Sequence, residues 1–378
     1  MPTRNVKMPK SSVFIASTGQ NIGKTTLCLG IISGLKKRYS KVGFIKPIGQ
    51  QHVTIEGNVT VDKDVILFKN AFQLEDPWAD MSPVIIPQGF TRDFIEGKVT
   101  EEGMTQKIKH SFQKISKAND YTIVEGTGHV GVGSIIDLSN AKVASLLGLE
   151  MVIVTSGGLG SAYDELALNL ALCKEHKVKV RGVILNRVYE EKREMILHYF
   201  PRLLKKWNIP LAGCIPYNEF LNNPTIKDFE YLFDTTLFAG EQHRYRHFKH
   251  TRLAASSLEA YEEEVILNEL VITPASREDI IHSVLKQHLA ASKMDGTDFQ
   301  GGMILTGRHP PSKEICEQIR RVDIPTLYAP LHSYDALKMI TSYIAKIRME
   351  DLPKVEKAIS LVEDNVDFNL LTNGHSSH

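Results

Sequence analysis

The chain has 378 residues, of which 42% are hydrophobic and 24% are charged. This composition disfavours disorder, collagen and coiled coil, and the length favours two domains over a single compact core. With 45 basic and 44 acidic residues the formal net charge is +1, so the chain as a whole has no electrostatic attraction for nucleic acid or for an anionic membrane.

Short apolar runs alternate with longer amphipathic stretches through the first half of the chain. Runs rich in Val and Ile, without polar alternation, predict buried strands at Ser12–Ser17, Lys41–Lys46, Tyr121–Glu125, Met151–Thr155, Arg181–Arg187 and Leu211–Ile215. The stretches between them predict helices, among them Thr25–Lys37, Val143–Leu147 and Asp164–His176. This alternation predicts an α/β domain over 11–216, with a parallel sheet covered by helices on both faces.

A looser polar and aromatic stretch over 217–250 is interpreted as a connecting segment. A second, smaller α/β domain is expected over 251–367, with strands at Glu269–Thr273, Gly302–Thr306 and Pro325–Tyr328 and helices at Arg277–Leu289 and Ser312–Arg321. Residues 368–378 are expected to form a flexible tail, because the last residues of the chain offer no apolar side chain to dock.

The segment Thr18–Thr25, with the sequence T-G-Q-N-I-G-K-T, lies between the first predicted strand and the first predicted helix. The P-loop pattern G-x-x-x-x-G-K-[ST] occurs in this context, and here only its first Gly is replaced, by Thr18. Backbone N–H groups at the start of a helix bind phosphate, the lysine reaches the β- and γ-phosphates, and the hydroxyl binds Mg²⁺. The predicted nucleotide-binding residues are Gly19, Gln20, Asn21, Ile22, Gly23, Lys24, Thr25 and Thr26.

Two more charged residues end predicted strands at the carboxyl edge of the sheet, where parallel α/β sheets bind ligands. Lys46 precedes Pro47, and a cation there can hold the γ-phosphate and stabilise charge during phosphoryl transfer. Lys24 and Lys46 are therefore the catalytic candidates. Glu125 precedes glycines at 126 and 128, so its carboxylate is predicted to bind Mg²⁺ together with Thr25.

These motifs resemble a known family. Ser17–Thr25, followed by Gly43–Pro47 and Val124–Gly128, resembles the dethiobiotin synthetase group of P-loop NTPases, and more closely the version of that domain at the N-terminus of long phosphotransacetylases. The ATPase domain of the cobyrinic acid a,c-diamide synthases is related. Leu270–Asp279 and Gly302–Gly307 resemble the DRTGG domain that follows in the phosphotransacetylases, although Ala275 and Ser276 replace an expected Gly-Asp pair.

The resemblance implies further site residues. Asp64, which lies 40 residues after Lys24, would be a second metal-binding carboxylate, with Asp62 as the alternative; either could instead cap a helix. Asn186 and Pro216 would flank the adenine, which makes the expected cofactors ATP and Mg²⁺.

Two functions remain open. The first is an Mg·ATP-binding protein with a regulatory or assembly role in phosphotransacetylase-type metabolism, with a metabolic enzyme as partner and a homo-oligomer as the expected assembly. The second is an ATP-dependent ligase that activates a small-molecule carboxylate by phosphorylation. A glutaminase is not expected, because neither Cys214 nor Cys316 lies on a nucleophile elbow. A phosphotransacetylase catalytic domain is not expected either, because the sequence stops after the second predicted domain. Whether the chain is an enzyme is therefore left open.

The remaining features indicate a cytoplasmic location without membrane or nucleic-acid partners. Four scattered cysteines without a C-x-x-C pair favour a reducing compartment, and no apolar run is long enough for a secretion signal or a membrane span. The basic, aromatic stretch around His243–Arg252 is interpreted as a solvated part of the connecting segment.

Overall fold

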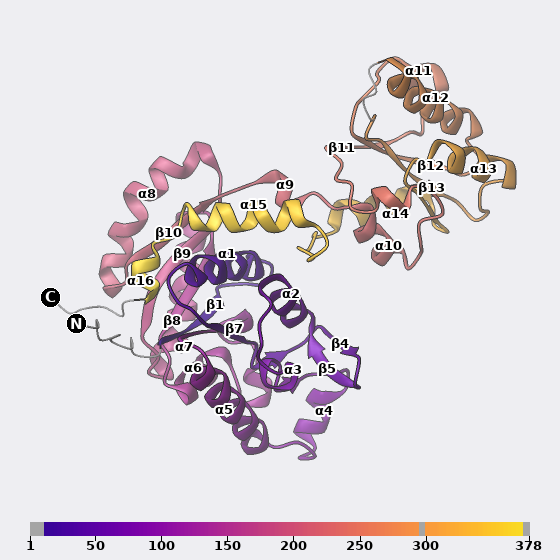
Figure 1. The fold of residues 1–378 in the computed structure, drawn as a ribbon. Coiled ribbons are helices and arrows are strands. Elements are labelled where there is room, and N and C mark those ends of the chain that lie inside the picture. Colours follow the sequence, from indigo (N-terminus) through magenta and orange to yellow (C-terminus); the bar gives the residue numbers. More distant parts are fainter. Residues whose placement is uncertain (1–10, 295–298, 373–378) are drawn as a thin grey trace, which may run out of the picture. The chain divides into compact units, whose positions relative to one another are not determined.

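The computed structural model describes residues 11–294 and 299–372, which divide into two units (Figure 1). The first unit contains residues 11–218 and also 347–372, and the second contains residues 219–346. The last six residues, expected to belong to a tail, lie outside the described residues.

The first unit is built on a six-stranded sheet in the order β10-β9-β8-β1-β7-β2, in which every pair of neighbours is parallel. All six predicted strands are confirmed. Their bounds are β1 Ser11–Ser17, β2 Val42–Ile45, β7 Tyr121–His129, β8 Met151–Ser156, β9 Val180–Val188 and β10 Leu211–Pro216. The central strand β1 is fully buried from Val13 to Ala16, as expected for a strand covered on both faces.

Helices cover both faces of this sheet, as predicted (Figure 1). One face carries α1 (Lys24–Lys36), and the opposite face carries α5 (Glu101–Ala118), α6 (Asn140–Leu147) and α7 (Gly160–Glu175). The helix α8 (Glu190–Leu204) packs along β10.

Between β2 and β7 the chain forms small elements that the sequence analysis did not resolve. They are β3 (Ile48–Gly49), which pairs with β6 (Val84–Ile85), the hairpin of β4 (His52–Ile55) and β5 (Val59–Asp62), and the helices α2 (Lys63–Phe72), α3 (Trp78–Met81) and α4 (Phe90–Ile95). The hairpin leads directly into α2, so it sets the position of the acidic residues at the start of that helix.

The chain returns to the first unit after residue 346. There α15 (Leu352–Glu363) packs on α1, and α16 (Phe368–Thr372) follows. A β-carbon on Gly30 would lie 2.2 Å from Val362 Cβ of α15, and one on Gly34 would lie 2.2 Å from Phe368 Cζ of α16. Both helices therefore contact α1 at a glycine, where α1 has no side chain. Tyr121 donates a hydrogen bond to the carbonyl of Leu371 at 2.7 Å.

This return differs from the expected boundaries at 367 and 368. The sequence analysis assigned residues 347–367 to the second domain and 368–372 to a flexible tail. In the structure Phe368 and Leu371 are buried in the first unit. An apolar helix pattern shows that a helix has a partner but does not say which partner, and this is the physical reason for the difference.

The second unit is a smaller parallel sheet in the order β11-β12-β13-β14. Its strands are β11 His250–Leu253, β12 Glu269–Pro274, β13 Gly302–Thr306 and β14 Thr326–Ala329, and the last three were predicted. Successive residues of the strands enter two cores, because side chains alternate across a sheet. Val271, Met303 and Leu305 enter one core, and Leu270, Ile272 and Ile304 enter the other.

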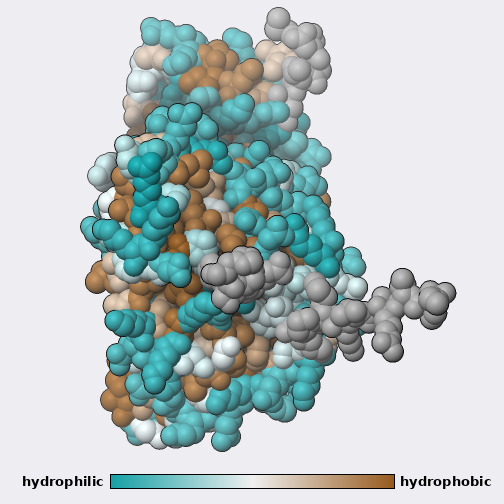
Figure 2. Space-filling model, turned by 90° about the vertical axis from the view of Figure 1, so that its left-hand side faces the viewer, coloured by the Kyte–Doolittle hydropathy of each residue, from teal (hydrophilic) through white to brown (hydrophobic). Residues whose placement is uncertain are grey.

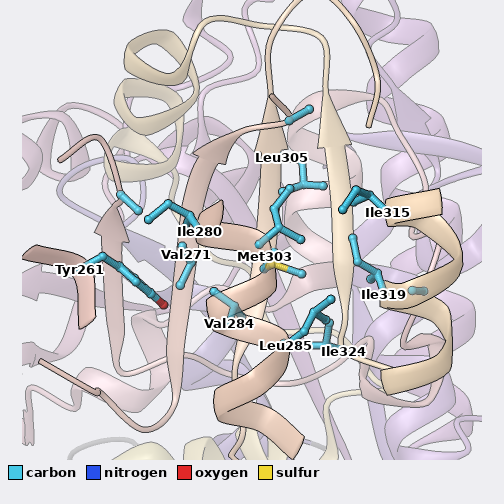
Figure 3. Close-up of a cluster of buried hydrophobic side chains, with 14 residues drawn as sticks. Tyr261, Val271, Ile280, Val284, Leu285, Met303, Leu305, Ile315, Ile319 and Ile324 are labelled. Carbon is cyan, nitrogen blue, oxygen red and sulfur yellow. The ribbon is translucent and has the colours of Figure 1, made fainter. Parts of the chain in front are cut away.

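The first of these cores lies under α11 (Leu258–Glu262), α12 (Glu278–Met294) and α13 (Lys313–Val322), with Ile280, Val284 and Ile315 among its side chains (Figure 3). The other core is covered by α10 (Ile226–Phe233) and α14 (Ser333–Ser342). The expected connecting segment 217–250 is thus largely part of the second unit: it contains α9 (Glu219–Asn222), α10 and a 3₁₀ turn at Glu241–His243. The sequence analysis did not predict that α10 supplies core residues.

Within the described residues, no helix is both long and apolar enough to cross a membrane. On the face shown in Figure 2, hydrophobic residues are interspersed with hydrophilic ones.

The contact between α1 and α15 predicts the effect of one added methyl group. Gly30→Ala should destabilise the chain by about 1–3 kcal/mol, because the new β-carbon overlaps Val362 Cβ and the two helices must separate. Gly103→Ala in the exposed first turn of α5 is the matched control, since its nearest new contact is an ordinary 3.4 Å, and it should stabilise by up to about 1 kcal/mol. Denaturant unfolding followed by circular dichroism measures both. Equal stability of the two variants would contradict the packing described here.

Candidate phosphate-binding site

The predicted P-loop forms a turn between β1 and α1. Asn21 and Gly23 have positive φ angles of 57° and 91°, and α1 begins at Lys24. Among the described residues, no backbone N–H from Gly19 to Thr26 donates a hydrogen bond to a protein acceptor. A row of N–H groups at the start of a helix, with no internal acceptor, is the arrangement that binds an anion.

Residues of α7 and of the end of β8 form hydrogen bonds with Thr18 at the start of this loop. The Thr18 hydroxyl lies 2.9 Å from a carboxylate oxygen of Glu165 and 3.1 Å from the hydroxyl of Thr155. The Asn169 side chain donates to the carbonyl of Thr18 at 3.3 Å and accepts from the N–H of Val130 at 3.1 Å. One buried amide therefore links the P-loop to the loop after Gly128.

Lys24 is folded back onto its own loop. Its ammonium group donates to the Ser17 hydroxyl and to the Gly128 carbonyl, each at 2.8 Å. Burial lowers the pKa of Lys24, and the charge of Glu125 opposes this shift. The lysine thus lies beside the P-loop with two neutral partners, which a phosphate could replace.

Lys46 is surrounded by carboxylates. Its Nζ lies 3.1 Å from Asp62 Oδ1 and 3.9 Å from Glu125 Oε1, and it also contacts Asp64 Oδ2. Burial opposes the charge on this ammonium, but the carboxylates of Asp64, Glu125 and Asp62 outweigh burial and raise the pKa of Lys46. Burial raises the pKa of Glu125, and Lys46 opposes that rise.

The two aspartates have different roles. Asp62 caps α2, since its Oδ1 accepts from the N–H of Asp64 at 3.0 Å, and its Oδ2 accepts from the N–H of Gln51 at 3.2 Å. Only 1% of the Asp62 side chain is exposed, against 27% for Asp64. This geometry favours Asp64 over Asp62 as a metal ligand.

The carboxylates fit a magnesium ion that arrives with phosphate. Glu125 Oε2 is buried and accepts no hydrogen bond from a nitrogen or hydroxyl group of the described residues, so one hard oxygen is available. Among all residues that the structure describes, no group of three or more His, Cys, Asp or Glu side chains is arranged to hold a metal ion without other ligands. Mg²⁺ usually takes one or two carboxylates together with water and substrate phosphates, and the sequence predicts that Thr25 supplies a hydroxyl beside them.

Pro216 ends β10 and Asn186 lies two residues before the end of β9, so the two residues do not lie opposite one another. Pro216 pairs with Val188. The Asn186 side chain is directed to the P-loop: it donates to the carbonyl of Ile22 at 2.7 Å. A β-carbon on Gly23 would lie 2.5 Å from Asn186 Nδ2, so this contact also requires glycine at position 23. A role of Asn186 and Pro216 beside the adenine stays a prediction.

Sequence reasoning missed the residues that support the loop, namely Thr155, Glu165 and Asn169. A signal was available for Asn169, which is a buried polar residue on the inner face of a predicted helix. Buried polar groups need partners, but the sequence does not show that the partner is Thr18.

Comparison with known families agrees with this geometry. A family model described as an AAA domain matches residues 11–225, and one described as a DRTGG domain matches residues 232–343.

Comparison with individual proteins gives relatives of two kinds. A phosphate acetyltransferase of Pseudomonas aeruginosa is 27% identical over 95% of this chain and 51% of its own length. The ATP-dependent dethiobiotin synthetase BioD of Methanocaldococcus jannaschii is 28% identical over 60% of this chain and 99% of its own length. Among solved structures, the cell division protein MinD of Aquifex aeolicus matches with a TM-score of 0.35 and 18% identity, over 56% of this chain and 84% of its own. The chain spans about half the length of the phosphate acetyltransferases it matches.

The hydrogen bond from the Asn186 side chain to the Ile22 carbonyl supports the P-loop, so we expect its removal to weaken nucleotide binding. Asn186→Ala should weaken Mg·ATP and Mg·GTP alike by about fivefold, the equivalent of one hydrogen bond of about 1 kcal/mol, because the P-loop and not the base loses its support. Calorimetric titration with both nucleotides measures the ratio, and Asn70→Ala on the exposed face of α2 is the control. A loss confined to ATP would instead assign Asn186 to the adenine.

Proposed function

Because the chain belongs to the AAA domain family over residues 11–225 and carries a DRTGG domain over residues 232–343, we propose that it binds Mg·ATP at its P-loop and regulates or assembles an enzyme of phosphotransacetylase-type metabolism. The main support for nucleotide binding is the row of backbone N–H groups from Gly19 to Thr26, which lies beside two buried lysines, Lys24 and Lys46. Lys24 and Lys46 would neutralise the phosphates, and Asp64, Glu125 and Thr25 would hold the metal.

The regulatory part is supported by the extent of the similarity. The similarity to the phosphate acetyltransferases includes both units of this chain and only about half of those proteins. Regions similar to both units occur together in those enzymes, and this suits a role of the present chain in sensing ATP for a partner enzyme.

A small pocket of about 60 Å³ favours a second candidate function, the phosphorylation of a small carboxylate in a ligase-type reaction. It is lined by apolar and neutral polar side chains, including Ile48, Gln50, Thr127, Ile136 and Asn140. Thr127 precedes Gly128, whose carbonyl accepts a hydrogen bond from Lys24, so the pocket adjoins the phosphate site. A small molecule bound there would be close to the γ-phosphate.

Calorimetric titration with Mg·ATP tests the nucleotide site. Lys24→Ala should weaken binding by roughly 10- to 100-fold, the value of a hydrogen bond to a charged group, because Lys24 is the ammonium closest to the predicted phosphates. Lys109→Ala on the exposed face of α5 makes the same charge change and should leave binding unaltered. Undetectable binding by the wild type, or equal binding by wild type and Lys24→Ala, would refute the proposal.

A trapping experiment separates the two candidate functions. A ligase should release ADP only when a suitable carboxylate is present, and hydroxylamine should trap the acyl phosphate as a hydroxamate. A regulatory protein should yield no hydroxamate with any carboxylate, and it should change the rate of a phosphotransacetylase that lacks these two domains when ATP is added.

A further inference from the structure

We propose that Lys46 takes the place of the metal ion in the nucleotide-free protein, so that a divalent cation enters the site only together with the nucleotide. This inference extends the proposed nucleotide site. Its test contains no nucleotide, so either proposal can fail without the other.

The geometry places one ammonium group among three carboxylates. Ile45 pairs with Val124 in the register of β2 and β7, which sets Lys46 beside Glu125, and the hairpin before α2 brings Asp62 and Asp64 to the same point. Lys46 Nζ is 3.1 Å from Asp62 and 3.9 Å from Glu125 and contacts Asp64, and the residue is 6% exposed. A divalent cation held by these carboxylates would compete with Lys46 Nζ for the same oxygens.

In the nucleotide-free protein the positive charge of Lys46 is needed to offset the repulsion between the carboxylates. Three carboxylates held close together at a buried site repel one another unless a cation lies between them. The other buried lysine of the site, Lys24, donates instead to Ser17 and Gly128. Lys46 is therefore the positive charge in direct contact with the cluster.

A second observation points to a missing ligand. Glu125 is 1% exposed, and its Oε2 accepts no hydrogen bond from a nitrogen or hydroxyl group of the described residues; the uncharged thiol of Cys28 is the neighbour of this carboxylate. An unpaired carboxylate oxygen at a buried position is costly, and a bound cation would supply the interaction it lacks. Lys46 approaches the other oxygen, so its ammonium group satisfies only part of the cluster.

The position of Lys46 among the carboxylates and the unpaired oxygen of Glu125 together indicate the order in which the metal ion and the nucleotide bind. Lys46 and a free divalent cation cannot share the carboxylates, because they would repel at a few ångström in a buried site. A triphosphate offers Lys46 new anionic acceptors, so the lysine can turn from the carboxylates to the phosphate as the metal–nucleotide complex enters. Free Mg²⁺ or Mn²⁺ should therefore not bind tightly by itself.

Mn²⁺ binding without nucleotide, followed by electron paramagnetic resonance, tests this. Lys46→Met should bind Mn²⁺ at least about tenfold more tightly than the wild type, because the competing charge is gone while the carboxylates remain. Lys24→Met is the matched control: it removes one buried positive charge from the same site but leaves Lys46 on the carboxylates, and its gain should be much smaller than that of Lys46→Met. Adding Asp64→Asn to Lys46→Met should abolish the gain.

Stability is a second readout, because Lys46→Met leaves three carboxylates uncompensated. The melting temperature of this variant should rise with Mn²⁺ by more than that of the wild type, and if the variant is unfolded without metal, Mn²⁺ should restore its circular dichroism. The proposal is overturned if the wild type binds Mn²⁺ as tightly as Lys46→Met, if Lys24→Met gains as much, or if Lys46→Met gains neither affinity nor stability from Mn²⁺.

Discussion

Ammonium and carboxylate groups are buried together at the carboxyl end of one parallel sheet, and the first unit is arranged around that burial. An isolated interior charge is costly, so Lys24, Lys46 and Glu125 can be buried only when their partners arrive with them. Ser17 ends β1, Gly128 lies in β7, and Asp62 connects the β4–β5 hairpin to α2. The strand order β1-β7-β2 places these ends side by side, which couples the formation of the site to the formation of the sheet.

The C-terminal segment adds a second constraint on the same site. The helix α1 begins at Lys24, and α15 packs on it at Gly30 and α16 at Gly34. The second unit is therefore inserted between two parts of the first unit along the chain, and the part that follows it supports the helix whose N-terminus faces the phosphate site. Support of this kind holds the P-loop amides in place before a ligand arrives, so less ordering is needed on binding.

The site contains the groups that phosphate recognition needs, and the adjoining pocket contains few that would identify a second substrate. Ile48, Ile86 and Ile136 make much of its lining apolar, and Gln50, Thr91 and Asn140 are neutral. A carboxylate substrate would therefore find its positive charge only at Lys24 and Lys46, which the nucleotide also needs. This shortage of cations is the physical reason why we place the regulatory role before the ligase role.

The sequence by itself determined the strands of the first sheet, the P-loop and the charged residues at strand ends, because buried parallel strands and a strand–loop–helix turn are local patterns. It did not reveal β11, the core role of α10, or the contacts of Thr155, Glu165 and Asn169 with the loops. Only the tertiary structure decided that Asp62 caps α2 while Asp64 contacts Lys46, that Asn186 supports Ile22, and that α15 and α16 pack on the first unit. Each of these depends on which distant residue lies nearby, and an apolar or polar pattern along the chain does not record its partner.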